Sequence, residues 1–156
     1  MSASIGSLFS GIGGLELGLE RAGFGPTAWQ VEIDPYCRAV LAKHWPDVRR
    51  YEDVRLVGPE LERVDVICGG FPCQDLSVAG RSAGLDGARS GLWGEMRRVI
   101  GEVGPGWVVV ENVHHGWARW MPVVRRGLFA LGFASVPIRV RASELGAWHR
   151  RARVFV

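Results

Sequence analysis

The sequence predicts an α/β fold in which helices cover both faces of a doubly wound, mostly parallel sheet. Two observations lead to this fold class. Short apolar segments alternate with longer amphipathic ones along the whole chain, which is typical of strands connected by covering helices. A glycine-rich turn, SGIGG at residues 10–14, follows the first apolar segment, as in folds that bind a ligand where a strand turns into a helix. The 156 residues fall within the roughly 100 to 200 typical of one domain, so we expect a single domain over residues 1–156.

Seven short apolar segments predict the strands of this sheet. They lie near residues 4–9, 27–32, 48–51, 64–68, 107–111, 135–140 and 152–156. Their lengths are those of strands that are buried between two layers of helices.

Four amphipathic segments between these strands predict helices. They cover residues 15–23, 35–45, 91–102 and 117–131. In the first of them, Leu15 and Leu19 share one face at i and i+4, and Gly23 ends the helix. Asp34 followed by Pro35 indicates an N-cap and a first-turn proline for the second helix.

Composition excludes several classes of protein. Hydrophobic residues make up 47% of the chain and charged residues 22%, as in soluble globular proteins. The longest apolar runs, such as WVVV at residues 107–110, fall far short of the about 18 residues that span a membrane, and the N-terminus lacks the pattern of a signal peptide. We therefore expect a cytoplasmic protein. The three cysteines and four histidines show no metal-ligand spacing, so we expect no metal site.

Charge is distributed unevenly along the chain. Residues 1–78 contain 7 basic and 11 acidic side chains, whereas residues 79–156 contain 12 basic and 5 acidic ones. Eighteen of the 19 basic residues are arginines, and arginine binds phosphate bidentately and stacks on bases. The second half therefore has the composition of a nucleic-acid-binding surface, although a bias in the nucleotide composition of the gene would give the same excess of arginine.

The glycine turn and two acidic residues after it suggest S-adenosylmethionine as a ligand. Gly11 and Gly13 match the first two glycines of the dinucleotide-binding pattern, but Glu16 occupies the third position, where a carboxylate would oppose a pyrophosphate. Glu32, about twenty residues further on, is placed to accept hydrogen bonds from ribose hydroxyls. Asp53, at the end of the third strand, is suitably placed for an adenine amino group. Taken alone, Glu32 could equally be a solvated acid at a strand end.

One cysteine lies on a loop rather than in a predicted strand or helix. Cys73 follows Pro72 in the irregular stretch 69–90, and a long irregular stretch inside a domain is usually functional. This loop leaves the C-terminal edge of the sheet, where ligands bind in such folds, so Cys73 is a candidate nucleophile. An inert loop thiol is the alternative. By contrast, Cys68 in a strand and Cys37 in a helix are expected to be buried.

A carboxyl group and two arginines are expected near the same edge of the sheet. Glu111 ends the strand of residues 107–111. Arg151 and Arg153, at i and i+2, share one face of an extended segment. Taken singly, Glu111 could cap a helix and the arginines could form a solvated basic tail. Together with Cys73 they predict a thiol, a carboxyl group and paired guanidinium groups that converge on one ligand.

Five motifs resemble, in order and spacing, those of the DNA (cytosine-5) methyltransferases. They are FSGIGGLELGLERAGF, VEIDPYCRAVL, GGFPCQDLSVAGR, ENV and HRRARVFV, and they extend over essentially the whole chain. The resemblance implies a Rossmann-like methyltransferase fold with an antiparallel strand at its C-terminal end. It also implies S-adenosylmethionine as cofactor, and DNA methylation of the restriction-modification type by a bacterial or phage-encoded enzyme.

The resemblance further implies a role for each candidate catalytic residue. Cys73 matches the nucleophile that adds to carbon 6 of cytosine and thereby activates carbon 5. Glu111 matches the carboxyl group that holds the exocyclic amine and N3. Arg151 and Arg153 match the arginine pair near the base carbonyl. Because carbon 5 is inaccessible inside a duplex, the cytosine must be flipped out.

By the same resemblance, two larger groups of residues have expected roles. The expected cofactor contacts are Phe9, Ser10, Gly11, Ile12, Gly13, Gly14, Glu32, Ile33, Asp53, Val54, Pro72 and Leu92. The expected substrate contacts, on the catalytic loop or beside it, are Gln74, Ser77, Arg81, Arg89 and Asn112. The loop of residues 74–90 would close over the flipped base.

The sequence departs from the family's pattern at three places. His149 replaces a glutamine and Ala152 an acid, both beside the arginine pair. The chain also stops at Val156, so the family's target-recognition domain and final cofactor-pocket helix are expected to be absent, and a second chain could supply target recognition. Two alternative functions remain. One is a cofactor- and DNA-binding partner of a split methyltransferase with little or no turnover, and the other is a methyltransferase that acts on tRNA cytosine.

Overall fold

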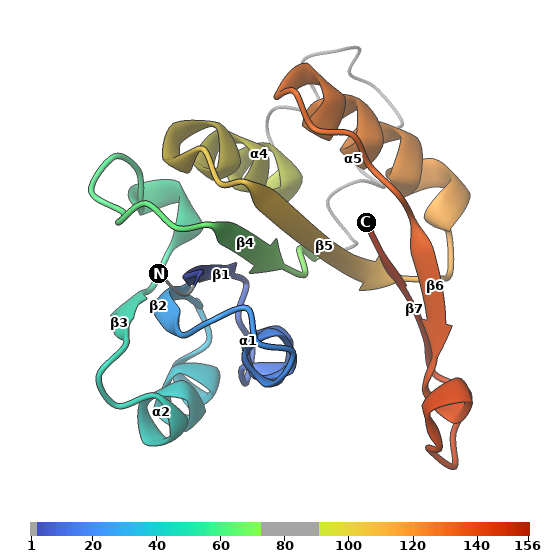
Figure 1. The fold of residues 1–156 in the computed structure, drawn as a ribbon, viewed down its shortest axis with the longest axis horizontal. Helices are drawn as coiled ribbons and strands as arrows, with labels where there is room; N and C mark the ends of the chain where they lie inside the picture. The colour runs from blue at the N-terminus through green and yellow to red at the C-terminus, as the bar shows by residue number, and fades with distance from the viewer. Residues whose placement is uncertain (1–2, 73–90) are drawn as a thin grey trace. The chain divides into compact units, whose positions relative to one another are not determined.

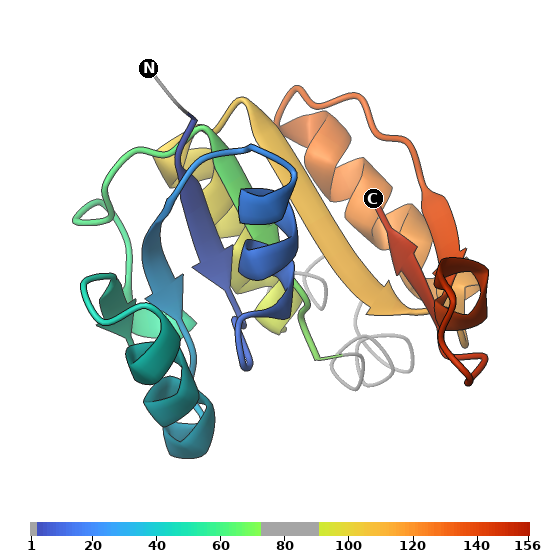
Figure 2. The same ribbon diagram turned by 60° about the horizontal axis from the view of Figure 1, so that its bottom comes forward.

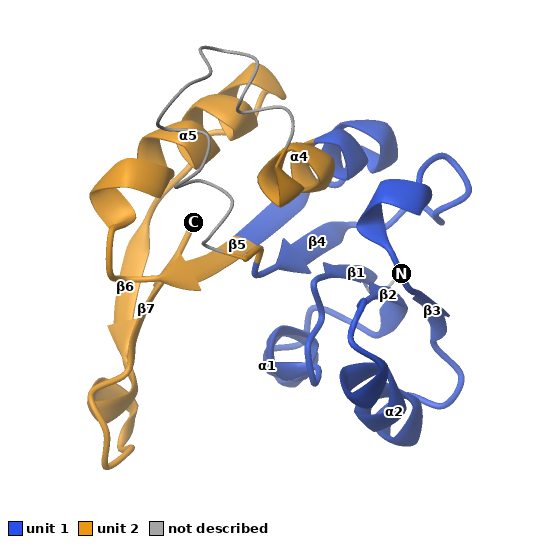
Figure 3. Ribbon diagram, turned by 180° about the vertical axis from the view of Figure 1, so that it is seen from behind, with its two compact units in different colours: residues 1–70, 98–109 blue, residues 71–97, 110–156 orange. Residues whose placement is uncertain are grey.

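The computed structural model describes residues 3–72 and 91–156. The chain divides into two compact units: unit 1 comprises Met1–Gly70 and Arg98–Val109, and unit 2 comprises Phe71–Arg97 and Val110–Val156 (Figure 3). Within the described ranges, every helix is too short or too polar to cross a membrane.

All seven predicted strands are present. They are β1 (Ile5–Leu8), β2 (Thr27–Val31), β3 (Arg49–Tyr51), β4 (Val66–Gly69), β5 (Trp107–Val113), β6 (Ile138–Arg141) and β7 (Ala152–Phe155). Their order in the sheet is β3-β2-β1-β4-β5-β7-β6 (Figure 1). β1 pairs in parallel with β2 and β4, and β2 with β3, whereas β7 runs antiparallel to β5 and β6. The predicted α/β class, with a mostly parallel sheet and an antiparallel strand at its C-terminal end, is confirmed.

The four predicted helices are also present, with small differences at their ends. They are α1 (Gly14–Arg21), α2 (Pro35–His44), α4 (Leu92–Val103) and α5 (Trp117–Ala130). Two short 3-10 helices, η1 (Val54–Leu56) and η2 (Ala142–Leu145), follow β3 and β6. As predicted, the Asp34 carboxylate caps α2, because it accepts a hydrogen bond from the backbone N–H of Cys37 at 2.9 Å.

In unit 1, α1 packs against the parallel strands. Leu15 and Leu19 contact the buried core of β1 and β4, and Figure 2 shows α1 in front of these strands. Cys68, in this core, is fully buried, and burial raises the pKa of its thiol far above the usual range. The prediction of a buried thiol at Cys68 is confirmed, whereas Cys37 on α2 is only half-buried.

In unit 2, an aromatic cluster joins α4 and α5 to the segment that follows β4. The ring centroid of Phe71 lies 5.5 Å from that of Trp93 and 6.4 Å from that of Trp120. The indole Nε1 of Trp120 also donates to the backbone oxygen of Val113 at 3.1 Å. These contacts tie α5 to the end of β5 and to the segment that leads toward Cys73.

Candidate active site

The turn between β1 and α1 is held in an uncommon backbone conformation. Phe9, Gly11 and Gly13 have positive φ angles of 54°, 56° and 90°, and a positive φ is uncommon for residues other than glycine. Ser10 anchors the turn, because its backbone N–H donates to the Val31 oxygen at 3.1 Å and its hydroxyl donates to the same oxygen at 3.3 Å. The glycine turn is therefore fixed to the end of β2.

A tryptophan packs directly under this turn. A side chain at Gly13 would overlap the ring of Trp45, which follows α2. The Trp45 Nε1 donates to the Glu20 carboxylate at 3.0 Å, and Glu20 also accepts from the Thr27 hydroxyl at 2.6 Å. Trp45 thus ties α2 to α1 and the turn. The sequence pattern does not reveal this role, since there Trp45 only marks the end of a helix.

Glu32 closes the glycine turn from the end of β2. Its Oε2 accepts from the backbone N–H of Gly11 at 2.7 Å, and its Oε1 accepts from the backbone N–H of Asp34 at 2.8 Å. A carboxylate can accept about four hydrogen bonds, so Glu32 retains capacity for the hydroxyl groups of a ligand. Its negative charge disfavours a phosphate at this turn.

Glu16 does not face the mouth of the turn. Its side chain is fully buried, its Oε1 accepts a weak hydrogen bond from Gln30 Nε2 at 3.4 Å, and burial raises the pKa of its carboxyl group. The Glu16 side chain therefore packs against the sheet, and the effect that the sequence suggests for it on a pyrophosphate stays a prediction. The Ser7 Oγ, Glu16 Oε2 and Gln30 Oε1 atoms are buried without a hydrogen-bond partner in the described part of the chain.

Replacing Glu16 by glutamine is expected to make the free energy of unfolding less dependent on pH. The pKa of Glu16 in the folded state lies above its ordinary value of 4.5, so the proton bound to Glu16 stabilises the fold. This stabilisation is full below pH 4.5 and is lost as pH rises through the folded-state pKa. Urea unfolding at several pH values should show Glu16→Gln gaining stability relative to the parent as pH rises. Glu62→Gln, at an exposed position of unit 1, controls for the loss of one charge. If the free energies of unfolding of Glu16→Gln and the parent differ by the same amount at every pH, the expectation is contradicted.

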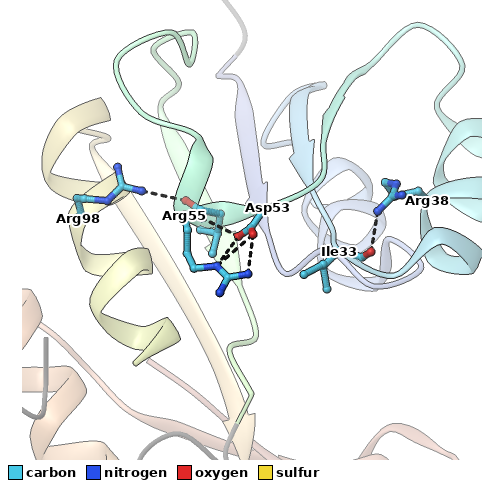
Figure 4. A network of polar contacts seen from close by, with 6 residues as sticks. Ile33, Arg38, Asp53, Arg55 and Arg98 are labelled. Carbon is cyan, nitrogen blue, oxygen red and sulfur yellow. Dashed lines mark hydrogen bonds and ion pairs between the residues drawn. The ribbon is translucent and has the colours of Figure 1, made fainter. Parts of the chain in front are cut away.

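Asp53, after β3, is held by its neighbour Arg55. Its Oδ2 lies 2.6 Å from Arg55 Nη2, and its Oδ1 accepts from the Nε and the backbone N–H of Arg55, both at 2.9 Å (Figure 4). These contacts lower the pKa of Asp53, so the carboxylate is ionised and oriented. The sequence analysis missed Arg55, although an opposite charge two residues from the acid is a signal that could have found it.

Two further arginines hold the backbone at predicted cofactor contacts. Arg38 Nη1 donates to the Ile33 oxygen at 2.7 Å, and Arg98 Nη2 donates to the Val54 oxygen at 2.9 Å (Figure 4). The Val54 side chain is buried, so a ligand would meet Val54 through backbone atoms. Ile33, next to Glu32, and Ile12, on the glycine turn, are 63% and 61% exposed, so both offer open apolar surface.

Glu111 and Arg153 form an ion pair in unit 2. Glu111 Oε1 lies 2.7 Å from Arg153 Nε, and both side chains are largely covered. Strand register explains the pair: Val113 of β5 is opposite Arg153 of β7, so Glu111, two residues from Val113, projects from the same face. Burial raises the pKa of Glu111, although Arg153 and Arg151 act in the opposite direction. Glu111 can therefore hold a proton at a higher pH than an exposed glutamate.

Asn112, next to Glu111, is a buried positioning residue. Its Nδ2 donates to the Phe71 oxygen at 3.0 Å, and its Oδ1 accepts from the backbone N–H of Val113 at 2.7 Å. The residue is only 3% exposed. The amide is thus hydrogen-bonded within unit 2, and the substrate contact expected from the sequence stays a prediction. Asn112 thereby fastens Phe71, two residues before Cys73, to the strand that carries Glu111.

Five predicted site residues lie outside the described ranges. They are Cys73, Gln74, Ser77, Arg81 and Arg89. Two predicted cofactor contacts belong to unit 2, where Pro72 is exposed and Leu92 begins α4. The roles of all these residues stay predictions, as does the convergence of Cys73 and Glu111 on one ligand.

The amino-acid sequence matches a known family over nearly its whole length. The family described as C-5 cytosine-specific DNA methylase matches residues 3–156. The Type II methyltransferase M2.BsuMI of Bacillus subtilis (strain 168) is 39% identical over 158 aligned residues, which cover 96% of this chain and 40% of the relative. The Type II methyltransferase M.Eco47II of Escherichia coli is 36% identical over 140 residues, which cover 85% of this chain and 33% of the relative. The chain thus spans less than half the length of these relatives.

A solved structure shares the fold. The S. pombe Dnmt2 methyltransferase aligns with 99% of this chain and 48% of its own, with a TM-score of 0.78 and 16% sequence identity. At this identity the similarity establishes the fold alone. The predicted methyltransferase fold is confirmed.

Proposed function

Because the chain belongs to the family of C-5 cytosine-specific DNA methylases, we propose that it transfers a methyl group from S-adenosylmethionine to carbon 5 of a cytosine in DNA. The family match over residues 3–156 carries this proposal. The Glu111–Arg153 ion pair and the glycine turn closed by Glu32 support it. DNA is the proposed partner, and a second chain that supplies target recognition stays a prediction.

The described residues of unit 1 fit an adenosyl group that carries no phosphate. The Glu32 carboxylate, fixed by two backbone N–H groups, would accept hydrogen bonds from ribose hydroxyls. Ile12 and Ile33 would give apolar contact, and Asp53 would accept a hydrogen bond from the adenine amino group. When bound, the cofactor would supply an electrophilic methyl group on a sulfonium centre.

Glu111 is the proposed proton-handling residue. A neutral carboxyl group can donate its proton toward N3 of cytosine with one oxygen and accept from the exocyclic amine with the other, and the raised pKa of Glu111 favours this form. The 2.7 Å contact with Arg153 fixes the orientation of Glu111. Together with Arg151, Arg153 also presents positive charge toward the base carbonyl.

Cys73 is the proposed nucleophile. Its thiolate sulfur forms a bond to carbon 6 of a flipped-out cytosine, the carbon 5–carbon 6 π electrons move to carbon 5, and N3 takes the proton from Glu111. Carbon 5 would take the methyl group as the bond between methyl and the sulfonium sulfur breaks, which leaves a thioether. Carbon 5 would then lose its proton to a base, the bond between carbon 6 and the Cys73 sulfur would break, and N3 would return its proton to Glu111. The double bond and the thiolate are then restored.

The direct test is the transfer of tritiated methyl from S-adenosylmethionine to unmethylated duplex DNA and to tRNA by the full chain. We expect label in DNA, at carbon 5 of cytosine. Label in tRNA alone would replace the DNA proposal with RNA methylation. Bound cofactor without transfer to either substrate would indicate a binding partner of a split enzyme.

A further inference from the structure

The hairpin formed by β6, η2 and β7 projects beyond the C-terminal end of β5. Val113, the last residue of β5, pairs with Arg153 of β7, whereas β6 and β7 stay paired one residue further, with Arg141 opposite Ala152. Figures 1 and 3 show η2 at the tip of this hairpin, away from β5. Residues 138–153 thus form a projecting arm.

The arm carries arginines on both of its faces. They are Arg139, Arg141, Arg150, Arg151 and Arg153. Since directly opposite residues of an antiparallel pair share a face, Arg139 and Arg141 project from one face, and Arg153 projects from the other, which is the face of Glu111. Glu144 is the single acidic residue of the arm, and it lies 3.7 Å from Arg141. Because Arg153 is paired with Glu111, the exposed positive charge that the proposed chemistry does not use comes from Arg139 and Arg150.

The tip of the arm exposes large apolar side chains. Trp148 is 96% exposed and Leu145 is 78% exposed, so both side chains are accessible to a ligand. Arginine side chains bind phosphates, and aromatic rings stack on bases or insert between them. The excess of arginine over acid on this projecting element matches a negatively charged ligand such as the phosphate backbone of DNA.

We propose that the arm enters a groove of duplex DNA beside the target cytosine, with Arg139 and Arg150 on phosphates and Trp148 against the bases. A two-stranded β-ribbon fits the major groove, which is about 12 Å wide. The arm projects from the end of β5 that follows Glu111, so DNA held by it lies at the edge of unit 2 that carries the proposed chemistry. The inference rests on the proposed function and adds DNA contacts by Arg139, Trp148 and Arg150, which are not among the proposed catalytic residues.

The test measures DNA affinity rather than turnover. Fluorescence anisotropy of a labelled, unmethylated duplex is recorded at several salt concentrations for the full chain, for Trp148→Ala and for the double variant Arg139→Gln/Arg150→Gln. We expect Trp148→Ala to weaken binding by about 5- to 150-fold, as for the loss of one stack between a base and an aromatic ring. The double variant should lower the slope of log K against log salt concentration by about 1 to 2.

Matched controls come from exposed residues elsewhere. Trp107→Ala changes a tryptophan that is 70% exposed at the opposite end of β5, and Arg21→Gln/Arg63→Gln changes two exposed arginines of unit 1. Circular dichroism checks that every variant keeps the fold. The proposal is overturned if the arm variants bind like these controls, if the parent binds no DNA, or if Trp148→Ala alters only the self-association of the protein in sedimentation. If the parent transfers no methyl group but the arm variants still lose DNA affinity, the proposed function is wrong and the proposed DNA contact of the arm is supported.

Discussion

Cys73→Ser is expected to abolish methyl transfer to DNA. The proposed bond to carbon 6 needs a thiolate, and a serine hydroxyl is a weak nucleophile unless a neighbouring base activates it. Removal of a catalytic nucleophile lowers turnover by about 10⁴-fold or more. In a steady-state assay with labelled S-adenosylmethionine, product should fall below detection, while the DNA affinity measured by anisotropy should stay close to that of the parent.

Cys37→Ser is the control for the loss of a thiol. Cys37 lies half-buried on α2 and has no role in the proposed chemistry, so this variant should keep the turnover of the parent. A Cys73→Ser protein that transfers methyl groups within about tenfold of the parental rate would show that the covalent step is wrong. Such a result would leave the membership of the family untouched, because that rests on the sequence match.

Glu111→Gln is expected to lower kcat by about 10²- to 10⁴-fold, the usual contribution of a general acid. Glutamine keeps the size of the side chain and can still accept a hydrogen bond from the exocyclic amine, but it has no acidic proton for N3. The affinity for DNA should change much less than kcat. A Glu111→Gln protein with the kcat of the parent and weaker DNA binding would assign Glu111 to binding alone.

The pH dependence of turnover is a second measure of the same residue. Burial raises the pKa of Glu111, and the proposal requires the protonated form. Turnover by the parent should therefore decline as pH rises through this pKa, and the residual turnover of Glu111→Gln should lack that decline. Arg153→Gln removes a positive charge that lowers the pKa of Glu111, so the decline in turnover of this variant should move to higher pH. An unmoved decline in Arg153→Gln would contradict the coupling that the 2.7 Å ion pair implies.

The order of strands and helices was predictable because it depends on local features. Asp34 caps α2 through a backbone N–H only three residues away, and Pro35 starts that helix. Gly11 and Gly13 mark a turn with positive φ angles, which other residues adopt at a cost. Each of these features joins residues that are close in sequence, so the pattern of residues contains them.

The surroundings of the polar side chains were not predictable in the same way. Glu16 occupies a motif position that suggests an exposed carboxylate, yet it meets Gln30 of β2 and is buried. Asn112 holds the Phe71 oxygen across 41 positions of sequence. These contacts depend on which elements become neighbours in the fold, and residue spacing along the chain carries no record of that.

By itself, the sequence determined the class of fold, the order of the motifs and the family, and through the family the candidates Cys73, Glu111 and Arg153. Only the tertiary structure decided that Glu111 pairs with Arg153, and that Glu32 rather than Glu16 closes the glycine turn. Periodicity and motif residues are local properties of the chain. Register across β5 and β7 and burial against the sheet arise only when distant segments meet, and they set the partners and the pKa values of the carboxyl groups.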